Sequence, residues 1–314
     1  MSKREITLWF LVSCGYLAVG LTLLAFGSPL HWILDLIAHL RVQYMIALAV
    51  LIPVALIARD RPAALVFLGA VLVNAAVVVP WSYVGAKATT LEPALKFVTV
   101  NVHSGNRRHE KVLSWLRKED PDVLLLLEVD ADWTRAFMPL TNSHPHFFTH
   151  PQNDIFGVAI FSRYPLGRAE LVSPGEGYVP SILARIDSPR GAVHLLGMHA
   201  IPPSNAEFAA LRNDMLSSVP ALVRDLPRPV IVAGDLQVAT WSTHFRRLLD
   251  NANLVDSARG KGLQPTWPMP VPWPGRITVD HVVASDDLVA VARRNGPDIG
   301  SDHLPVIVDY AFRE

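Results

Sequence analysis

Residues 230–237 read VIVAGDLQ, a strand-length apolar run that passes directly into a polar turn. Val230 to Ala233 have the aliphatic composition of a strand covered on both faces, and Gly234-Asp235-Leu236-Gln237 follow where that strand ends. Functional groups concentrate beyond strand ends, because loops held by a rigid scaffold carry them. The stretch therefore predicts a buried strand with functional groups at the point where the strand ends.

The same arrangement recurs on both sides of this stretch. Apolar runs are followed by short polar signatures, which are Asn101, Glu128, His199, Asp280-His281 and Ser301-Asp302-His303. Together they supply carboxylates, imidazoles and amides but no thiolate, since the only cysteine is Cys14. Such a set of donors suits a hard cation such as Mg²⁺ or Mn²⁺, bound through oxygen.

Apolar runs and helical patterns alternate through the rest of this region. We predict strands at 97–100, 123–127, 158–161, 182–186, 193–197, 230–233, 280–283 and 305–308, and helices at 109–118, 205–219 and 242–249. Residues 264–275 hold five prolines together with Trp267 and Trp273, which predicts a stiff loop. That loop is either a packed lid or an apolar rim for a lipid substrate.

The N-terminal part differs in composition from this domain. Three apolar runs, at about 6–26, 42–58 and 63–80, are each near the length that crosses a hydrocarbon core. We predict a transmembrane anchor at 1–86 and a catalytic domain at 87–314; two spans, or a cleaved signal peptide before two buried helices, are the alternatives. Lys3, Arg4, Arg59 and Arg61 flank the runs, so three spans would place the catalytic domain outside the cytoplasm.

Charge argues against a nucleic-acid partner. The chain has 28 basic and 28 acidic residues, and five of the basic and three of the acidic ones precede residue 87. The remaining 23 basic and 25 acidic residues make the second domain slightly acidic. A protein that binds a phosphate backbone tightly usually carries a basic stripe.

The ordered series from Asn101 to Ser301-Asp302-His303 resembles the endonuclease/exonuclease/phosphatase superfamily, over roughly residues 95–312. This superfamily includes DNase I-like nucleases, neutral sphingomyelinases and inositol-polyphosphate phosphatases. With its N-terminal spans, the chain is similar to a membrane-anchored bacterial branch that includes glycopeptide-resistance membrane proteins. The resemblance implies a four-layer α/β sandwich, two face-to-face sheets flanked by helices, in a protein of the bacterial cytoplasmic membrane.

The resemblance also implies a role for each residue of the series. Glu128 would be the principal metal ligand, with Asn101 and Asp302 near the same ion. His303 would be the general base or stabilise the developing phosphorane, and Asp280 would fix its tautomer. Asp235 would orient or activate the attacking water, and His199 would donate to a nonbridging phosphoryl oxygen. Gln237 stands where the family usually has Asn, and offers the same amide on a longer side chain.

These observations predict a membrane-anchored, divalent-metal-dependent phosphohydrolase whose partners are the bilayer and a lipid-linked phosphate, pyrophosphate or phosphodiester. A polyprenyl pyrophosphate is one specific candidate. The first alternative is a metal-dependent nuclease. The second, prompted by Gln237, is a weakly active or inactive phosphate-binding sensor.

Overall fold

The N-terminal part is a group of helices, described by a computed structural model that covers residues 2–85 and 90–313. They are α1 (Lys3–Leu24), the short η1 (Ala25–Gly27), α2 (Trp32–His39), α3 (Arg41–Ile57) and α4 (Arg61–Tyr83). Helices α1 and α4 are long and apolar enough to cross a membrane, and α3 forms a third such segment only together with α2, from which it is bent by 58°. The three predicted apolar runs are thus helical. The predicted domain boundary at 86/87 lies outside the described residues.

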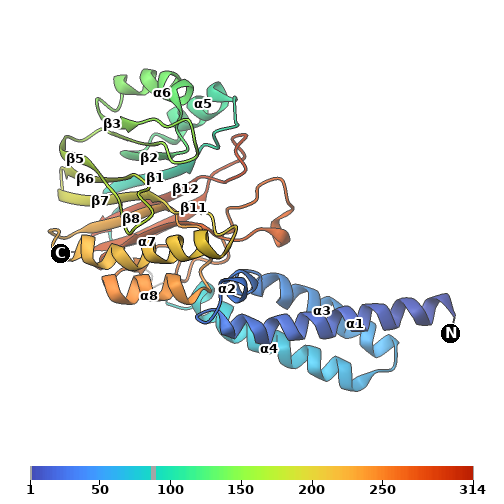
Figure 1. Ribbon diagram of the computed structural model, residues 1–314. Coiled ribbons are helices and arrows are strands. Elements are labelled where there is room, and N and C mark those ends of the chain that lie inside the picture. Colours follow the sequence, from blue (N-terminus) through green and yellow to red (C-terminus); the bar gives the residue numbers. More distant parts are fainter. Residues whose placement is uncertain (1, 86–89, 314) are drawn as a thin grey trace.

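Helices α1, α3 and α4 extend away from the rest of the chain as an antiparallel group (Figure 1). Phe67 fills its interior and contacts Gly15 so closely that a Cβ there would lie 2.1 Å from the ring. Leu17 and Leu65, by contrast, are more than 60% exposed, as expected of side chains that face lipid. The N-terminus and the α3–α4 turn lie at the far end of the group (Figure 1), where Asp60 accepts a hydrogen bond from the backbone of Ala63 and caps α4.

The second part is a four-layer α/β sandwich, which confirms the predicted fold class. One six-stranded sheet has the order β11-β12-β1-β2-β4-β3, and the other has the order β5-β6-β7-β8-β10-β9. Their inner faces share a core that includes Phe97, Leu125, Leu195 and Ile231. Helices α5 and α6 cover the outer face of the first sheet, and α7 and α8 cover that of the second (Figure 1).

The elements of the sandwich have the following bounds. The helices are α5 (His109–Glu119), α6 (Ala131–Phe137), η2 (Met138–Asn142), α7 (Ala206–Arg224), α8 (Thr243–Ala252) and η3 (Trp273–Gly275). The strands are β1 (Leu95–Asn101), β2 (Val123–Leu127), β3 (His146–His150), β4 (Val158–Ser162), β5 (Leu166–Val172), β6 (Ser181–Ser188), β7 (Gly191–His199), β8 (Val230–Asp235), β9 (Val255–Asp256), β10 (Asp280–Ala284), β11 (Leu288–Asn295) and β12 (Val306–Phe312).

All eight predicted strands and all three predicted helices correspond to observed elements. The prediction missed β3, β5, β9 and β11, which lie at sheet edges. Edge strands are half exposed and carry charged residues, as in Arg168 and Glu170 of β5, so they lack the continuous apolar runs on which the prediction rested. It also missed the short helices α2 and α6.

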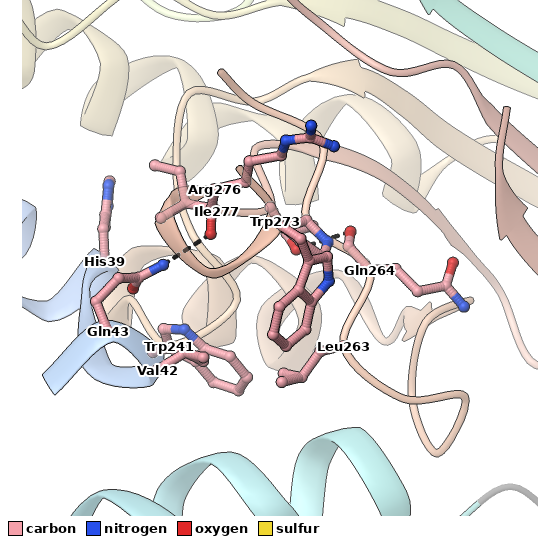
Figure 2. A pocket seen from close by; sticks show the side chains of 11 residues that line it. His39, Val42, Gln43, Trp241, Leu263, Gln264, Trp273, Arg276 and Ile277 are labelled. Carbon is pink, nitrogen blue, oxygen red and sulfur yellow. Dashed lines mark hydrogen bonds between the residues drawn. The ribbon is translucent and has the colours of Figure 1, made fainter. Parts of the chain in front are cut away.

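Direct hydrogen bonds join the helical group to the sandwich. The Trp81 indole donates to Asp256 (3.2 Å), and the Gln43 amide donates to the carbonyl groups of Pro274 (2.9 Å) and Arg276 (2.8 Å). Figure 2 shows this second junction, where Trp273 helps to line a small cavity between the start of α3 and the proline-rich loop. The helical group therefore contacts the sandwich beside the loop that was predicted to be a lid or a rim.

Candidate active site

Three neighbouring strands place His199, Asp235 and Asp280 in one row. The register of β7 with β8 pairs His199 with Asp235, and that of β8 with β10 pairs Asp280 with Asp235. Gly234 makes the row possible, because its φ is +134° and a Cβ there would lie 2.0 Å from the carbonyl oxygen of Met198. The glycine in the predicted Gly-Asp signature is therefore a steric requirement.

Residues from the other sheet close this row into a cluster. Asn101 ends β1 and Glu128 follows β2, and the two strands are parallel neighbours. The Asn101 amide donates to Glu128 Oε1 (2.9 Å) and to Asp235 Oδ2 (3.3 Å), so it links the two sheets. The fold thus gathers Asn101, Glu128 and Asp235, which lie far apart in the sequence.

His303 lies between two carboxylates. Its Nδ1 is 2.9 Å from Asp280 Oδ2 and its Nε2 is 3.6 Å from Asp235 Oδ2. Ser301 fixes the loop, since its hydroxyl donates to the Asn101 carbonyl and accepts from the His303 backbone. Burial alone would lower the pKa of His303, but the two carboxylates outweigh it and raise the pKa to about 10. The imidazole is therefore cationic at neutral pH and able to donate to an anionic oxygen.

Asp235 is the most heavily contacted carboxylate of the cluster. Gln237 donates to it through its side-chain amide (2.8 Å) and through its backbone N–H (3.0 Å). Burial would raise the pKa of Asp235, but His303 and His199 lower it, so the group is ionised. The Gln237 side chain therefore folds back onto Asp235, and its length allows the amide to reach the carboxylate.

His199 lies deeper than the sequence suggested. It is fully buried, with Nδ1 donating to the Ile155 carbonyl (2.8 Å) and Nε2 3.4 Å from Asp235 Oδ2. Burial would lower its pKa, but Asp235 outweighs burial and raises it. The structure makes His199 a partner of Asp235, and its predicted contact with a phosphoryl oxygen stays a prediction.

Around Glu128 the structure adds a residue that the sequence analysis assigned no role. Glu128 accepts from the Ser104 backbone (2.9 Å), and His103 Nδ1 lies 3.7 Å from Glu128 Oε2 and 3.4 Å from Asp302 Oδ1. Asp302 also accepts from the Trp267 indole (3.1 Å), so it approaches Glu128 across His103 and has no direct bond to Asn101. The place of His103, two residues after Asn101, was the only signal for it in the sequence.

The donor atoms fit a divalent cation. Glu128, Asp235 and Asp280 are buried, and no lysine or arginine among the described residues lies within 4 Å of their carboxylates, whose only charged partners are histidines. The cationic His303 compensates Asp235 and Asp280. Among the described residues, Glu128 has only the half-exposed His103 as a basic partner within 4 Å, and a buried carboxylate with so little compensation is costly unless a metal neutralises it. Two sets of residues could hold an ion. The first is Glu128 with Asn101. The second is Asp235 with Asp280 and His303, and the ligand atoms of this second set lie within 4.8 Å of one another.

A cavity of about 440 Å³ extends from this cluster to α2 of the helical group. Its polar end contains Gln237, Asp302 and His303. The remaining lining residues, mostly apolar, are Leu36, His39, Leu40, Pro202, Pro203, Ser204, Trp267, Ile277 and Val279. The site can therefore accommodate a molecule with one anionic end and one apolar end.

Known structures share this fold. An endonuclease/exonuclease/phosphatase from Beutenbergia cavernae is 20% identical with a TM-score of 0.57, over 70% of this chain and 72% of that one. D. rerio TDP2, complexed with a single-strand DNA product, is 18% identical with a TM-score of 0.58, over 70% and 99% of the two chains. A Staphylococcus aureus beta toxin mutant with bound magnesium ions is 18% identical with a TM-score of 0.54, over 69% and 99%.

Comparison with curated protein sequences gives no match. A sequence model of the Endonuclease/Exonuclease/phosphatase family, however, matches residues 98–303, which is most of the sandwich and includes every candidate site residue. The predicted resemblance to this superfamily is therefore confirmed, and with it a phosphoesterase as the general class of activity. The chain belongs to the endonuclease/exonuclease/phosphatase family.

Proposed function

We propose that the chain is a membrane-anchored, divalent-metal-dependent phosphohydrolase whose substrate is a lipid-linked phosphate, pyrophosphate or phosphodiester. The observation that carries the proposal is the cavity, because it runs from His303 to Leu36 on the anchor helix α2 and to Leu40 directly after that helix. A soluble or polymeric phosphate ester would gain nothing from that apolar half.

The surface beside α2 supports a lipid substrate. Leu30 is 82% exposed and Ile33 is 46% exposed, and both lie where the helical group meets the sandwich. Exposed apolar side chains at this level are expected of a segment at the membrane interface. A site held there would meet lipid substrates at a raised effective concentration.

The chemistry proposed for the cluster is hydrolysis by water. Asp235 accepts a proton as the water oxygen bonds to phosphorus, and the leaving oxygen departs with the electron pair of the broken phosphorus–oxygen bond and takes up a proton from solvent. His303, held by Asp280 through Nδ1, donates to a phosphoryl oxygen from Nε2, while Gln237 and His199 hold Asp235. A bound Mg²⁺, held by Glu128 and Asn101, would neutralise phosphate charge.

We further propose that the sandwich lies outside the cytoplasm. Lys3 and Arg4 at the N-terminus and Arg59 and Arg61 in the α3–α4 turn all lie at the end of the helical group that is remote from the sandwich (Figure 1). Basic residues in short flanking segments stay on the cytoplasmic side. A C-terminal reporter that works only in the cytoplasm should therefore be silent, and an active one would reverse the orientation.

The function is tested on the detergent-purified full chain with a polyprenyl pyrophosphate, a phosphatidyl lipid, sphingomyelin and DNA, each with Mg²⁺ and with chelator. We expect chelator-sensitive turnover of a lipid and its loss in Glu128→Ala. Turnover of DNA alone would establish the nuclease, and no turnover by folded protein would favour a phosphate-binding sensor.

The role of the cavity has its own test. Leu36→Trp narrows the apolar half, and Ile33→Trp is the matched control, since it places the same side chain on the same helix outside the cavity. We expect kcat/KM for the lipid to fall about tenfold in the first variant only, with bis-p-nitrophenyl phosphate hydrolysis unchanged in both. Equal effects on both substrates would contradict a lipid-binding role.

A further inference from the structure

We infer that Asp35 and Arg212 form a positioning pair through which the anchor helix α2 holds the loop that carries Gln237. Asp35 Oδ2 lies 2.7 Å from an Arg212 guanidinium nitrogen, and both side chains are fully buried. The other terminal nitrogen of Arg212 donates to the Gln237 carbonyl (2.6 Å). The guanidinium thus connects a membrane-proximal carboxylate directly to the backbone of a candidate active-site residue.

Three further residues of this loop region, Ala239, Ser242 and Thr243, are hydrogen-bonded to the same segment of the anchor. Ser242 donates to Asp35 Oδ1 (2.6 Å), and the Ala239 backbone donates to His39 Nε2 (3.4 Å). Ser28 donates to Asp35 Oδ1 (2.9 Å) and accepts from the Thr243 backbone (3.3 Å). Ala239, Ser242 and Thr243 are therefore bonded directly to the anchor, and Gln237 is connected to it through Arg212.

A purely stabilising role does not explain this network. A buried ion pair gains little net stability, because desolvation of the two charges offsets their attraction, and apolar residues of similar size commonly serve equally well. The pair instead fixes the relative orientation of the groups that it joins, because a guanidinium presents its hydrogen-bond donors in a rigid fork. Here one side of the fork meets Asp35 and the other meets Gln237.

The consequence for the site follows from the position of Gln237. Its φ of +52° is unusual for a side chain with a Cβ, so the surrounding contacts must maintain it. In that conformation both its backbone N–H and its side-chain amide reach Asp235. Loss of the Arg212 contact would let the carbonyl turn and move both donors away from Asp235, and a displacement of about 1 Å can cost on the order of a hundredfold in rate.

The experiment compares full-length variants in detergent. Asp35→Asn removes the carboxylate charge, and Asp35→Asn/Arg212→Gln removes both charges, so that no unpaired charge is left buried if the single variant unfolds. Asp60→Asn is the matched control, because it makes the same change in the anchor at the remote end of the bundle. Hydrogen exchange of peptides covering 236–243 and 230–235 and steady-state kinetics are the two measurements.

We expect faster exchange at 236–243 but not at 230–235, and about a hundredfold lower kcat with KM changed less than threefold, in the Asp35 variants but not in Asp60→Asn. Adding Asp35→Asn to Gln237→Ala should cause no further loss of kcat, because both act on Asp235 through one residue. Unchanged exchange in a folded variant, or fully additive losses, would overturn the inference.

The effect on rate rests on the proposed function, whereas the exchange measurement does not. A wild-type protein that turns over no substrate would refute the proposed function, and the exchange at 236–243 would still decide whether the anchor holds the loop.

Discussion

Replacing Glu128 with glutamine should stabilise the metal-free protein while removing its response to Mg²⁺. Both Glu128 Oε1 and Asp235 Oδ2 accept from the single Asn101 amide nitrogen, at 2.9 and 3.3 Å, so the two carboxylates approach within about 6 Å of each other. At an effective dielectric constant of about 20, two such charges repel by about 3 kcal/mol.

Two smaller effects reduce this gain. Glutamine accepts more weakly from the Ser104 backbone and from Asn101, at a cost of about 1 kcal/mol. His103 is the one basic side chain within 4 Å of the Glu128 carboxylate among the described residues, and it offsets little of the repulsion because it is 44% exposed. The net stabilisation without metal is about 2 kcal/mol, or roughly 4 to 8 °C in Tm for a domain of this size.

Magnesium reverses the order of the two proteins. A ligand at a hundred times its Kd stabilises the folded state by about 2.7 kcal/mol, so wild-type protein should gain roughly 5 to 10 °C and Glu128→Gln almost nothing. Thermal unfolding in detergent with chelator and across a Mg²⁺ titration measures both. Asp132→Asn, which removes a half-exposed carboxylate on α6, serves as the control. A wild-type response to Mg²⁺ in Glu128→Gln would refute this assignment of the metal ligand.

Three further predictions follow from single contacts. Gly234→Ala should cost at least about 3 kcal/mol of unfolding free energy, since the added Cβ would lie 2.0 Å from the Met198 carbonyl; wild-type stability in denaturant titration would contradict this. Asp280→Asn should lower kcat about a thousandfold, because His303 loses its charged Nδ1 partner, and should also lower stability, because one half of a buried ion pair is removed; an unchanged kcat in folded protein would show that His303 needs no such partner. Burial lowers the pKa of His144 below its ordinary value of 6.5, so the neutral imidazole contributes fully to the free energy of unfolding above that pH, and the contribution is lost as the pH falls below it. His144→Gln should therefore flatten the pH dependence of the free energy of unfolding between about pH 7.5 and 5.5, as measured by denaturant titration.

The sandwich could be predicted because its central strands are buried on both faces. Strands such as β2 and β8 are continuous apolar runs, and each ends in the polar group that the site uses. Once β7, β8 and β10 are paired in register, Asp235 lies directly opposite both His199 and Asp280. Edge strands and short helices were missed because half-exposed elements mix polar and apolar residues in patterns that loops also show.

The site was predicted less completely than the fold, and for a geometric reason. Sequence signatures identify which residues end strands, but not how deep each side chain lies or which neighbour it faces. His199 and Gln237 both turn onto Asp235, a relation that depends on the 3.4 and 2.8 Å separations reached only after folding. His103 was passed over because a histidine in a polar loop has no distinguishing pattern of its own.

The Asp35–Arg212 pair was the feature least accessible from the sequence, although Asp35 itself stands out there. Asp35 is the only acidic residue between the first two predicted apolar runs, and in the sequence it contributes only to the charge balance of that segment. A carboxylate in such a segment is expected to have a buried partner, because an unpaired charge there is costly. The partner lies 177 residues away on α7, in a helix whose apolar pattern gives no sign that Arg212 faces inward. The helical group and the sandwich, which composition separates cleanly, therefore share one buried network, and the helix α2 that joins them also contributes the carboxylate that holds the loop carrying Gln237.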